Sequence, residues 1–156
     1  MLRIEIPGYG DSGLEFLVMD FNGTLACDGA LIEGVRAALE TLSKQLQLHV
    51  VTADTFGRAR EALCDVPCRL VVLPAGNQAE AKRDYVEALG ASASAAIGNG
   101  RNDSLMLKAA ALGIALMQQE GAAKEAILAA DVVSPDILSG LGLLAHPLRL
   151  KATLRR

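Results

Sequence analysis

The sequence predicts an α/β fold in which helices cover a central, mainly parallel sheet. Short apolar runs rich in Val, Ile and Leu alternate along the chain with longer segments of helical period, as in parallel strands joined by crossover helices. Gly, Asn and Asp residues also concentrate directly after three of these runs. With 156 residues and 51% hydrophobic composition, the chain is long enough for one core. We therefore expect a single domain over residues 1–156.

Seven segments have the composition of strands. Each is short, apolar and bounded by polar or turn-forming residues. We place them at residues 2–6, 15–19, 48–52, 70–73, 95–97, 113–116 and 132–133. Because helical segments separate most of them, we expect parallel pairing in the main sheet.

The segments between the strands carry apolar stripes at helical spacing. One stripe consists of Val35, Leu39 and Leu42, a second lies within residues 78–89, and a third follows Asn102. The Ala-rich segment 122–130 is also expected to be helical. Pro135 and Pro147 each fit the start of a short helix.

The composition excludes several classes of partner. Charged residues make up 21% of the chain and balance to a net charge of -3, so no basic face predicts nucleic-acid binding. Aromatic residues are only 3%, which disfavours stacking platforms for bases. The longest apolar stretch, 105–117, is interrupted by Lys108 and is too short to cross a bilayer. With no secretory signal visible, we expect a cytoplasmic protein without membrane insertion.

The three cysteines agree with a reducing compartment, because an odd number cannot complete an intramolecular disulfide framework. Cys64 and Cys68 lack the second pair of ligands that a metal site needs. We expect both to be buried structural thiols.

The first polar cluster is DFNGT, residues 20–24, directly after an apolar strand. Gly23 allows the backbone to turn tightly beside a ligand, and the Asp20 carboxylate could attack phosphorus. An Asx turn leaving the strand accounts for the same Asp and Gly, although it does not need Thr24. Both interpretations stay open for this cluster alone.

Two weaker features follow it. Thr52 and Asp54 end another strand with a hydroxyl and a carboxylate, and they could bind an anion or cap the next helix. Lys82 lies in the helical segment 78–89, where it could neutralise phosphate or simply face water.

The last cluster is GNGRND, residues 98–103, between a strand and an apolar helix. Its glycines permit close approach of the backbone to a ligand, and Asp103 offers hard oxygen ligands. Mg²⁺ usually takes one or two carboxylates together with waters and substrate phosphate, so Asp20 and Asp103 would suffice. Alternatively, Asn102 or Asp103 caps the following helix.

Taken in order, these clusters resemble the four motifs of the haloacid dehalogenase (HAD) superfamily of phosphohydrolases. The resemblance runs from residue 16 to about 131. Within the superfamily, TAD at residues 52–54 and GNGRND resemble T-G-D and G-D-G-x-N-D of P-type ATPases. This resemblance implies a three-layer, Rossmann-like HAD core with a central, mainly parallel sheet. Only residues 25–49 separate the first two motifs, which leaves no room for a sizeable cap domain.

The resemblance also implies roles for individual residues. Asp20 would be the nucleophile that becomes an aspartyl phosphate, with Asn22 at the position of the usual acid/base and Thr52 and Lys82 completing the catalytic set. The residues implied to bind phosphate are Asp20, Gly23, Thr52, Ala53, Lys82 and Asn102. Those implied to hold Mg²⁺ are Asp20, Asn22 through its main-chain carbonyl, Asn99 and Asp103.

Two positions depart from the family pattern. Most soluble phosphatases of the superfamily carry an aspartate at the position of Asn22 and use it as general acid and base, which Asn cannot do. General acid–base help contributes ~10²–10⁴ in rate, so turnover is expected to be slow. Asn99 replaces a second aspartate near the metal, so we expect a higher metal requirement.

Three functions fit these observations. The first is a Mg²⁺-dependent phosphatase or phosphotransferase acting through Asp20 on a phosphorylated small molecule or a phosphoprotein. The second is a catalytically weak, phosphate-binding regulatory module related to P-type ATPase phosphorylation domains. The third is an oligomeric sugar-acid phosphate phosphatase, whose D-G pair after the first motif matches Asp28 and Gly29. The resemblance also implies that an uncapped site of this kind meets a macromolecular substrate or is covered by another subunit, as in a homo-oligomer.

Overall fold

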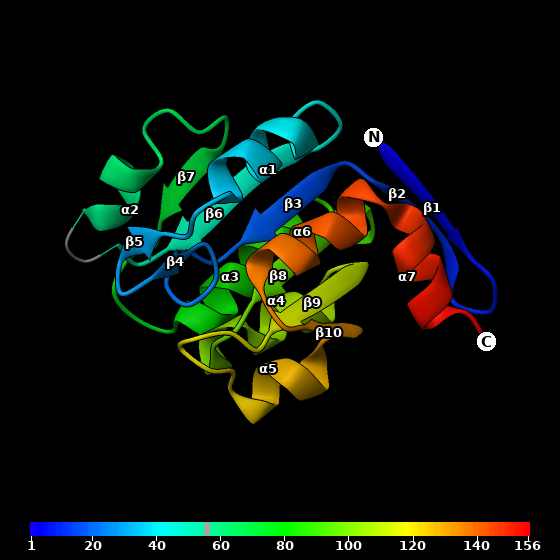
Figure 1. The fold of residues 1–156 in the computed structure, drawn as a ribbon. Coiled ribbons are helices and arrows are strands. Elements are labelled where there is room, and N and C mark those ends of the chain that lie inside the picture. Colours follow the sequence, from blue (N-terminus) through cyan, green and yellow to red (C-terminus); the bar gives the residue numbers. More distant parts are fainter. Residues whose placement is uncertain (55–56) are drawn as a thin grey trace.

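The computed structural model of the protein describes residues 1–54 and 57–156, and at residues 11 and 12 it describes the backbone alone. A parallel sheet lies at the centre, with helices on both of its faces (Figure 1). Within the described residues, no helix is long and apolar enough to cross a membrane.

The central sheet has six strands, and every neighbouring pair is parallel. In spatial order they are β10 (Val132–Ser134), β9 (Leu112–Leu116), β8 (Ser94–Gly98), β3 (Phe16–Met19), β6 (Gln47–Thr52) and β7 (Arg69–Val72). From β3 the chain first builds outward through β6 and β7, then returns to β8 on the other side of β3. The order therefore reverses between β3 and β8, where ligands bind in open α/β sheets.

The described residues also form seven α-helices and two short 3₁₀ helices. They are α1 (Val35–Leu42), α2 (Arg58–Ala62), α3 (Gln78–Leu89), η1 (Ala91–Ala93), η2 (Arg101–Asp103), α4 (Ser104–Ala109), α5 (Lys124–Ala129), α6 (Ile137–Ala145) and α7 (Pro147–Leu154). α3, α4 and α5 cover one face of the sheet, while α1 and α6 cover the other (Figure 1).

Successive side chains of each central strand alternate between the two faces of the sheet, and this divides the hydrophobic core into two clusters. In β3, Leu17 and Met19 join the core cluster beneath α1 and α6, whereas Val18 joins the cluster with α3, α4 and α5. Successive side chains of a strand point to opposite faces, so a strand covered on both sides must be apolar throughout. The three-layer, mainly parallel architecture that the sequence predicts is confirmed.

Two small hairpins lie outside the central sheet. β1 (Leu2–Ile6) pairs antiparallel with β2 (Gly10–Leu14), and α7 packs against this hairpin. β4 (Ala26–Cys27) pairs antiparallel with β5 (Ala30–Leu31). Between the first two motifs the chain therefore forms only the β4–β5 hairpin and α1, as expected of a core without a sizeable cap.

The seven predicted strands are all present, with ends shifted by at most one residue. Three short strands were not predicted: β2, whose sequence is rich in glycine and polar residues, and the two-residue strands β4 and β5. The expected burial of both thiols was wrong, because Cys64 is exposed and Cys68 is only half-buried on the short connection that follows α2.

Candidate active site

The carboxyl ends of β3, β6 and β8 gather the polar clusters that the sequence singled out. β3 runs directly into Asp20, β6 ends at Thr52, and β8 leads into the loop that carries Asn99. The backbone N–H of Asp20 donates to the carbonyl of Ile97 at 3.1 Å, which fixes the first loop against β8. The first and last motifs therefore meet at the point where the strand order reverses.

A buried ion triad forms the centre of this region. The Lys82 ammonium donates to Asp20 Oδ1 at 2.8 Å and to Asp103 Oδ1 at 2.7 Å. Lys82 is 1% exposed, Asp20 7% and Asp103 0%. The interpretation of Lys82 as a solvent-facing lysine is therefore wrong, because its helix α3 directs the ammonium inward between two carboxylates.

Burial and charge set the ionisation of the triad. Burial, together with the nearby negative charge of Asp103, raises the pKa of Asp20 to about 7, although Lys82 opposes this shift. Burial alone would lower the pKa of Lys82, but the two carboxylates outweigh it and raise that pKa above its usual value. Lys82 therefore stays charged, while Asp20 titrates near neutrality.

Asp103 also fixes the loop that follows β8. Its second oxygen, Oδ2, accepts hydrogen bonds from the backbone N–H groups of Asn99 at 3.0 Å and Gly100 at 2.8 Å. A Cβ atom at Gly98 would lie 2.5 Å from the Asp103 carboxyl carbon, so this position requires glycine. The side chain of Asp103 thus turns back towards its own loop and makes no capping hydrogen bond to α4.

The loop after Asp20 is held mainly by its own backbone. The carbonyl of Phe21 accepts from the N–H groups of Thr24, Leu25 and Ala26 at 3.0–3.2 Å. Gly23 has a φ of +73°, and a Cβ atom there would lie 2.4 Å from the amide nitrogen of Asn99. The N–H of Gly23 donates to the carbonyl of Ala26. Gly23 is therefore needed for both the turn and the close approach of the two loops.

The two Asn substitutions occupy different environments. Asn99 is half-buried: its amide oxygen accepts from the Thr24 hydroxyl at 3.3 Å, and its amide nitrogen donates to the carbonyl of Gly121 at 3.0 Å. Asn22 is exposed on the nucleophile loop. Asn99 thus joins the first and last motifs directly, whereas the side chain of Asn22 faces solvent at the site.

The remaining predicted residues border this centre. Thr52 is buried at the end of β6, where its hydroxyl accepts from the N–H of Asp54 at 3.3 Å. The Asp54 carboxylate accepts from the N–H groups of Ala59 and Arg60 in α2, so Asp54 has the helix-capping role considered above. Ala53, between them, is half-buried.

Asn102 lies on the α3 side of the site. Its amide donates to the side-chain oxygen of Gln78 at 3.2 Å. Both residues line an open hollow of about 650 Å³ between α3 and α4, together with Arg101 and Ser104. The assignment of Asn102 and Gly23 to phosphate binding stays a prediction.

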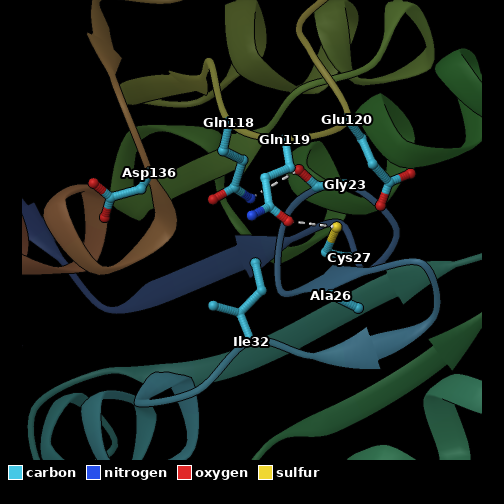
Figure 2. A pocket seen from close by; sticks show the side chains of 8 residues that line it. All are labelled: Gly23, Ala26, Cys27, Ile32, Gln118, Gln119, Glu120 and Asp136. Carbon is cyan, nitrogen blue, oxygen red and sulfur yellow. Dashed lines mark hydrogen bonds between the residues drawn. The ribbon is translucent and has the colours of Figure 1, made fainter.

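Sequence reasoning missed Gln118. This residue lies just beyond β9, and its side chain reaches the nucleophile loop, where its amide nitrogen donates to the carbonyl of Gly23 (Figure 2). The same nitrogen also donates to the carbonyl of Thr24. It also lines a cavity of about 170 Å³ with Cys27, Ile32 and Glu120. The available signal was its position directly after a strand of the parallel sheet, the same signal that identified the other clusters.

The donors near Asp20 fit a hard cation such as Mg²⁺. Asp20 has a second oxygen beyond the one that Lys82 contacts, and Asn22 contributes a main-chain carbonyl that accepts no backbone hydrogen bond from the described residues. Asn99 adds an amide oxygen on the adjoining loop. Oxygen donors of this kind match the preference of Mg²⁺. Both Asp103 oxygens already accept hydrogen bonds, so its role as a metal ligand stays a prediction.

Comparisons with known proteins support the fold. No family model matches the chain. Among solved structures, 3-deoxy-D-manno-octulosonate 8-phosphate phosphatase from Moraxella catarrhalis has a TM-score of 0.70 at 14% identity, over 90% of this chain and 89% of that one. A zinc-transporting PIB-type ATPase has a TM-score of 0.60 at 22% identity, over 80% of this chain and 20% of that one.

Two relatives come from Methanocaldococcus jannaschii, and both are named only as uncharacterized proteins. MJ0073 is 53% identical over 60 residues, which are 38% of this chain, and the chain spans 64% of its length. MJ0072 is 38% identical over 39 residues, which are 25% of this chain and 89% of that protein. The chain therefore belongs to one family with MJ0072 and has the fold of HAD-superfamily hydrolases.

Proposed function

We propose that the protein is a Mg²⁺-dependent phosphatase or phosphotransferase that acts through an aspartyl phosphate on Asp20. The observation that carries this proposal is the buried triad in which Lys82 contacts both Asp20 and Asp103. Burying three charged groups costs desolvation free energy, so such a triad is not expected without a function. A carboxylate with a perturbed pKa at the end of a parallel strand is a candidate catalytic group. The substrate is a phosphorylated small molecule or a phosphoprotein.

In the first step, an oxygen of ionised Asp20 attacks the phosphorus atom of the substrate. The bond from phosphorus to the leaving-group oxygen breaks, and its electron pair departs with that oxygen. Lys82 contacts the Asp20 carboxylate and therefore lies within reach of the negative charge that builds up around it. The buried Thr52 hydroxyl would orient the transferred group.

The leaving oxygen takes its proton from water, because the amide of Asn22 has no acidic proton to transfer. Water then attacks the phosphorus of phospho-Asp20, the bond from phosphorus to the Asp20 oxygen breaks, and inorganic phosphate leaves. A carboxylate at position 22 would assist both proton transfers, so each step is slower without it. Phospho-Asp20 should consequently persist long enough to be detected.

Mg²⁺, which would be held by Asp20, the Asn22 carbonyl, Asn99 and Asp103, would neutralise phosphate charge. With Asn99 in place of a carboxylate, the site attracts the cation less strongly. We therefore expect a higher metal requirement than that of a site with an aspartate at position 99.

Intact-protein mass spectrometry tests the proposal. The wild type and Asp20→Ala are incubated with Mg²⁺ and acetyl phosphate, and Asp84→Ala serves as a matched control because Asp84 is an exposed aspartate on α3. We expect a phosphate-sized mass gain in the wild type and the control that is absent from Asp20→Ala. An equal adduct in Asp20→Ala would place the nucleophile elsewhere.

A second candidate is a phosphate-binding regulatory module. Asn22 and Asn99 favour it, because they replace the acid/base aspartate and the second metal-binding aspartate of the family pattern. The residues proposed to bind phosphate, including Thr52 and Lys82, remain. Phosphate binding to the wild type, without any adduct or phosphate release, would support this module over the enzyme.

A third candidate is an oligomeric sugar-acid phosphate phosphatase. The similarity in fold to the Moraxella phosphatase and the Asp28–Gly29 pair at the β4–β5 hairpin favour it. Release of phosphate from sugar phosphates by an oligomer would support this candidate. A monomer inert towards those substrates would exclude it.

A further inference from the structure

Gln118 connects three segments that are distant in the sequence. Its amide nitrogen donates to the carbonyl oxygens of Gly23 at 2.9 Å and Thr24 at 2.7 Å. Its amide oxygen accepts from the N–H of Ile137, the first residue of α6, at 3.0 Å. Figure 2 shows the side chain of Gln118 directed towards Gly23 and joined to it by a hydrogen bond. Gln118 thus links the nucleophile loop to the start of α6.

These contacts specify a glutamine. Two carbonyls lie on one side of the amide and one N–H lies on the other, so the NH₂ group must face the carbonyls and the oxygen must face α6. Glutamate has nearly the same shape but, when ionised, has no hydrogen to donate, and it would place negative charge against two carbonyl oxygens. Leucine would leave the same carbonyls and the N–H without this partner.

The loop is restrained from two sides by different residues. The Thr24 hydroxyl contacts Asn99 in the loop after β8, while the carbonyls of Gly23 and Thr24 point to Gln118. Asn22 directly precedes Gly23, and Asp20 lies two residues before Asn22. A shift of the anchored carbonyls therefore changes where the Asp20 carboxylate and the Asn22 carbonyl lie.

We propose that Gln118 is a positioning residue that fixes the nucleophile loop for phosphoryl transfer. This inference rests on the proposed function of Asp20. Misplacement of a reacting group by ~1 Å can cost ~10²-fold in rate, so we expect Gln118→Leu and Gln118→Glu to slow phosphorylation of Asp20 by roughly 10- to 100-fold. The concentration of acetyl phosphate at half-maximal rate should change less than about threefold, because these variants keep Thr52 and Lys82.

The test measures the rate of the phosphate-sized mass gain at several acetyl phosphate concentrations in the wild type, Gln118→Leu, Gln118→Glu and Gln45→Glu. Gln45 is an exposed glutamine that precedes the amino end of β6, whereas the site lies at the carboxyl ends of the strands. Its replacement by Glu should leave the rate unchanged. A lower maximal rate at a nearly unchanged half-saturating concentration supports the proposal. Wild-type rates in both Gln118 variants would overturn it.

Amide hydrogen exchange supplies a readout that does not need activity. The N–H groups of residues 23–26 donate to the Phe21 and Ala26 carbonyls within the loop. In Gln118→Leu we expect their exchange to accelerate at least tenfold, while the amides of β6 keep their protection. Unchanged exchange at residues 23–26, or an equal acceleration everywhere, would refute a specific positioning role. If even the wild type forms no adduct, the proposed function fails, and this comparison alone decides whether Gln118 positions the loop.

Discussion

Replacement of Lys82 by Met removes the only cation from the buried triad. Met approximates the length of Lys but carries no charge, so the Asp20 and Asp103 carboxylates lose the ammonium that lies 2.8 and 2.7 Å from their oxygens. Exposures of 7% and 0% leave water little room to replace it. We expect the variant to be markedly less stable and unable to phosphorylate Asp20.

The magnitude follows from the burial of the pair. Breaking a buried ion pair by removing one partner typically costs about 3–5 kcal/mol, because the remaining charge stays desolvated. For a domain of this size, each kcal/mol lowers the melting temperature by about 2–4 °C, which gives a decrease of roughly 6–20 °C. Lys82→Met with Asp103→Asn should recover part of this decrease, because one of the two uncompensated charges is gone.

The decrease in the melting temperature of Lys82→Met should also depend on pH, and its direction follows from the pKa of Asp20. The pKa of Asp20 is already raised to about 7, and removal of the Lys82 charge, which opposes that shift, raises it further. A carboxyl group with a raised pKa binds its proton more tightly in the folded state, so its effect on stability becomes more favourable as pH falls. Lys82→Met should therefore lose more stability at pH 8 than at pH 5.5.

Thermal unfolding of the wild type, Lys82→Met and Lys108→Met at these two pH values tests the reasoning. Lys108 is exposed on α4, and its replacement should change the melting temperature little. A wild-type melting temperature for Lys82→Met at pH 8 would refute the buried-triad argument. A decrease of equal size at both pH values would refute its electrostatic part.

Three further predictions concern the acid/base role of residue 22, the ionisation of Asp20 and the packing of Gly98 in the loop after β8. Asn22→Asp should raise turnover of an aryl phosphate at least about tenfold by restoring an acid/base group, measured as phosphate release; an unchanged or lower rate would remove Asn22 as the bottleneck. Formation of phospho-Asp20 should increase with pH around the raised Asp20 pKa of about 7, because only the ionised carboxylate attacks; a mass-spectrometric time course that is flat across this range would contradict the assignment. Gly98→Ala should lower stability by roughly 1–3 kcal/mol through overlap with Asp103, as measured by denaturant unfolding, whereas Gly142→Ala within α6 should raise it by about 0.5–1 kcal/mol. Equal stability of the two glycine variants would show that the site loop adjusts freely.

Much of the fold could be predicted because the central strands are buried on both faces. Strands such as β3, β8 and β9 read as continuous apolar runs, and helices at a regular period separate them. The ends of these runs also placed Asp20, Thr52 and Asn99 at one edge of the sheet. Short elements such as β4 and β5 carried no comparable signal, because two paired residues bury too little apolar surface to leave a pattern.

The roles of individual site residues were harder to predict than their positions. The role of Asp103 as a metal ligand stays a prediction, but the hydrogen bonds that its two oxygens accept from Lys82 and from two backbone N–H groups were not predicted. Gln118 escaped notice because a glutamine after a strand has no distinctive spacing. Both roles depend on contacts between segments far apart in the sequence, and local periodicity carries no information about such contacts.

The two Asn substitutions also change the charge that a phosphate group meets at the site. When fully ionised, Lys82 with its two carboxylates leaves one net negative charge. Aspartates in place of Asn22 and Asn99 would add two more. The site therefore repels a phosphate dianion less than a site with aspartates at positions 22 and 99 would. It also attracts a cation less, because both effects have the same electrostatic origin. Under the proposed function, Asn99→Asp should therefore lower the Mg²⁺ concentration needed for half-maximal phosphorylation of Asp20. An unchanged or higher requirement in that variant would show that the charge of residue 99 does not control metal binding.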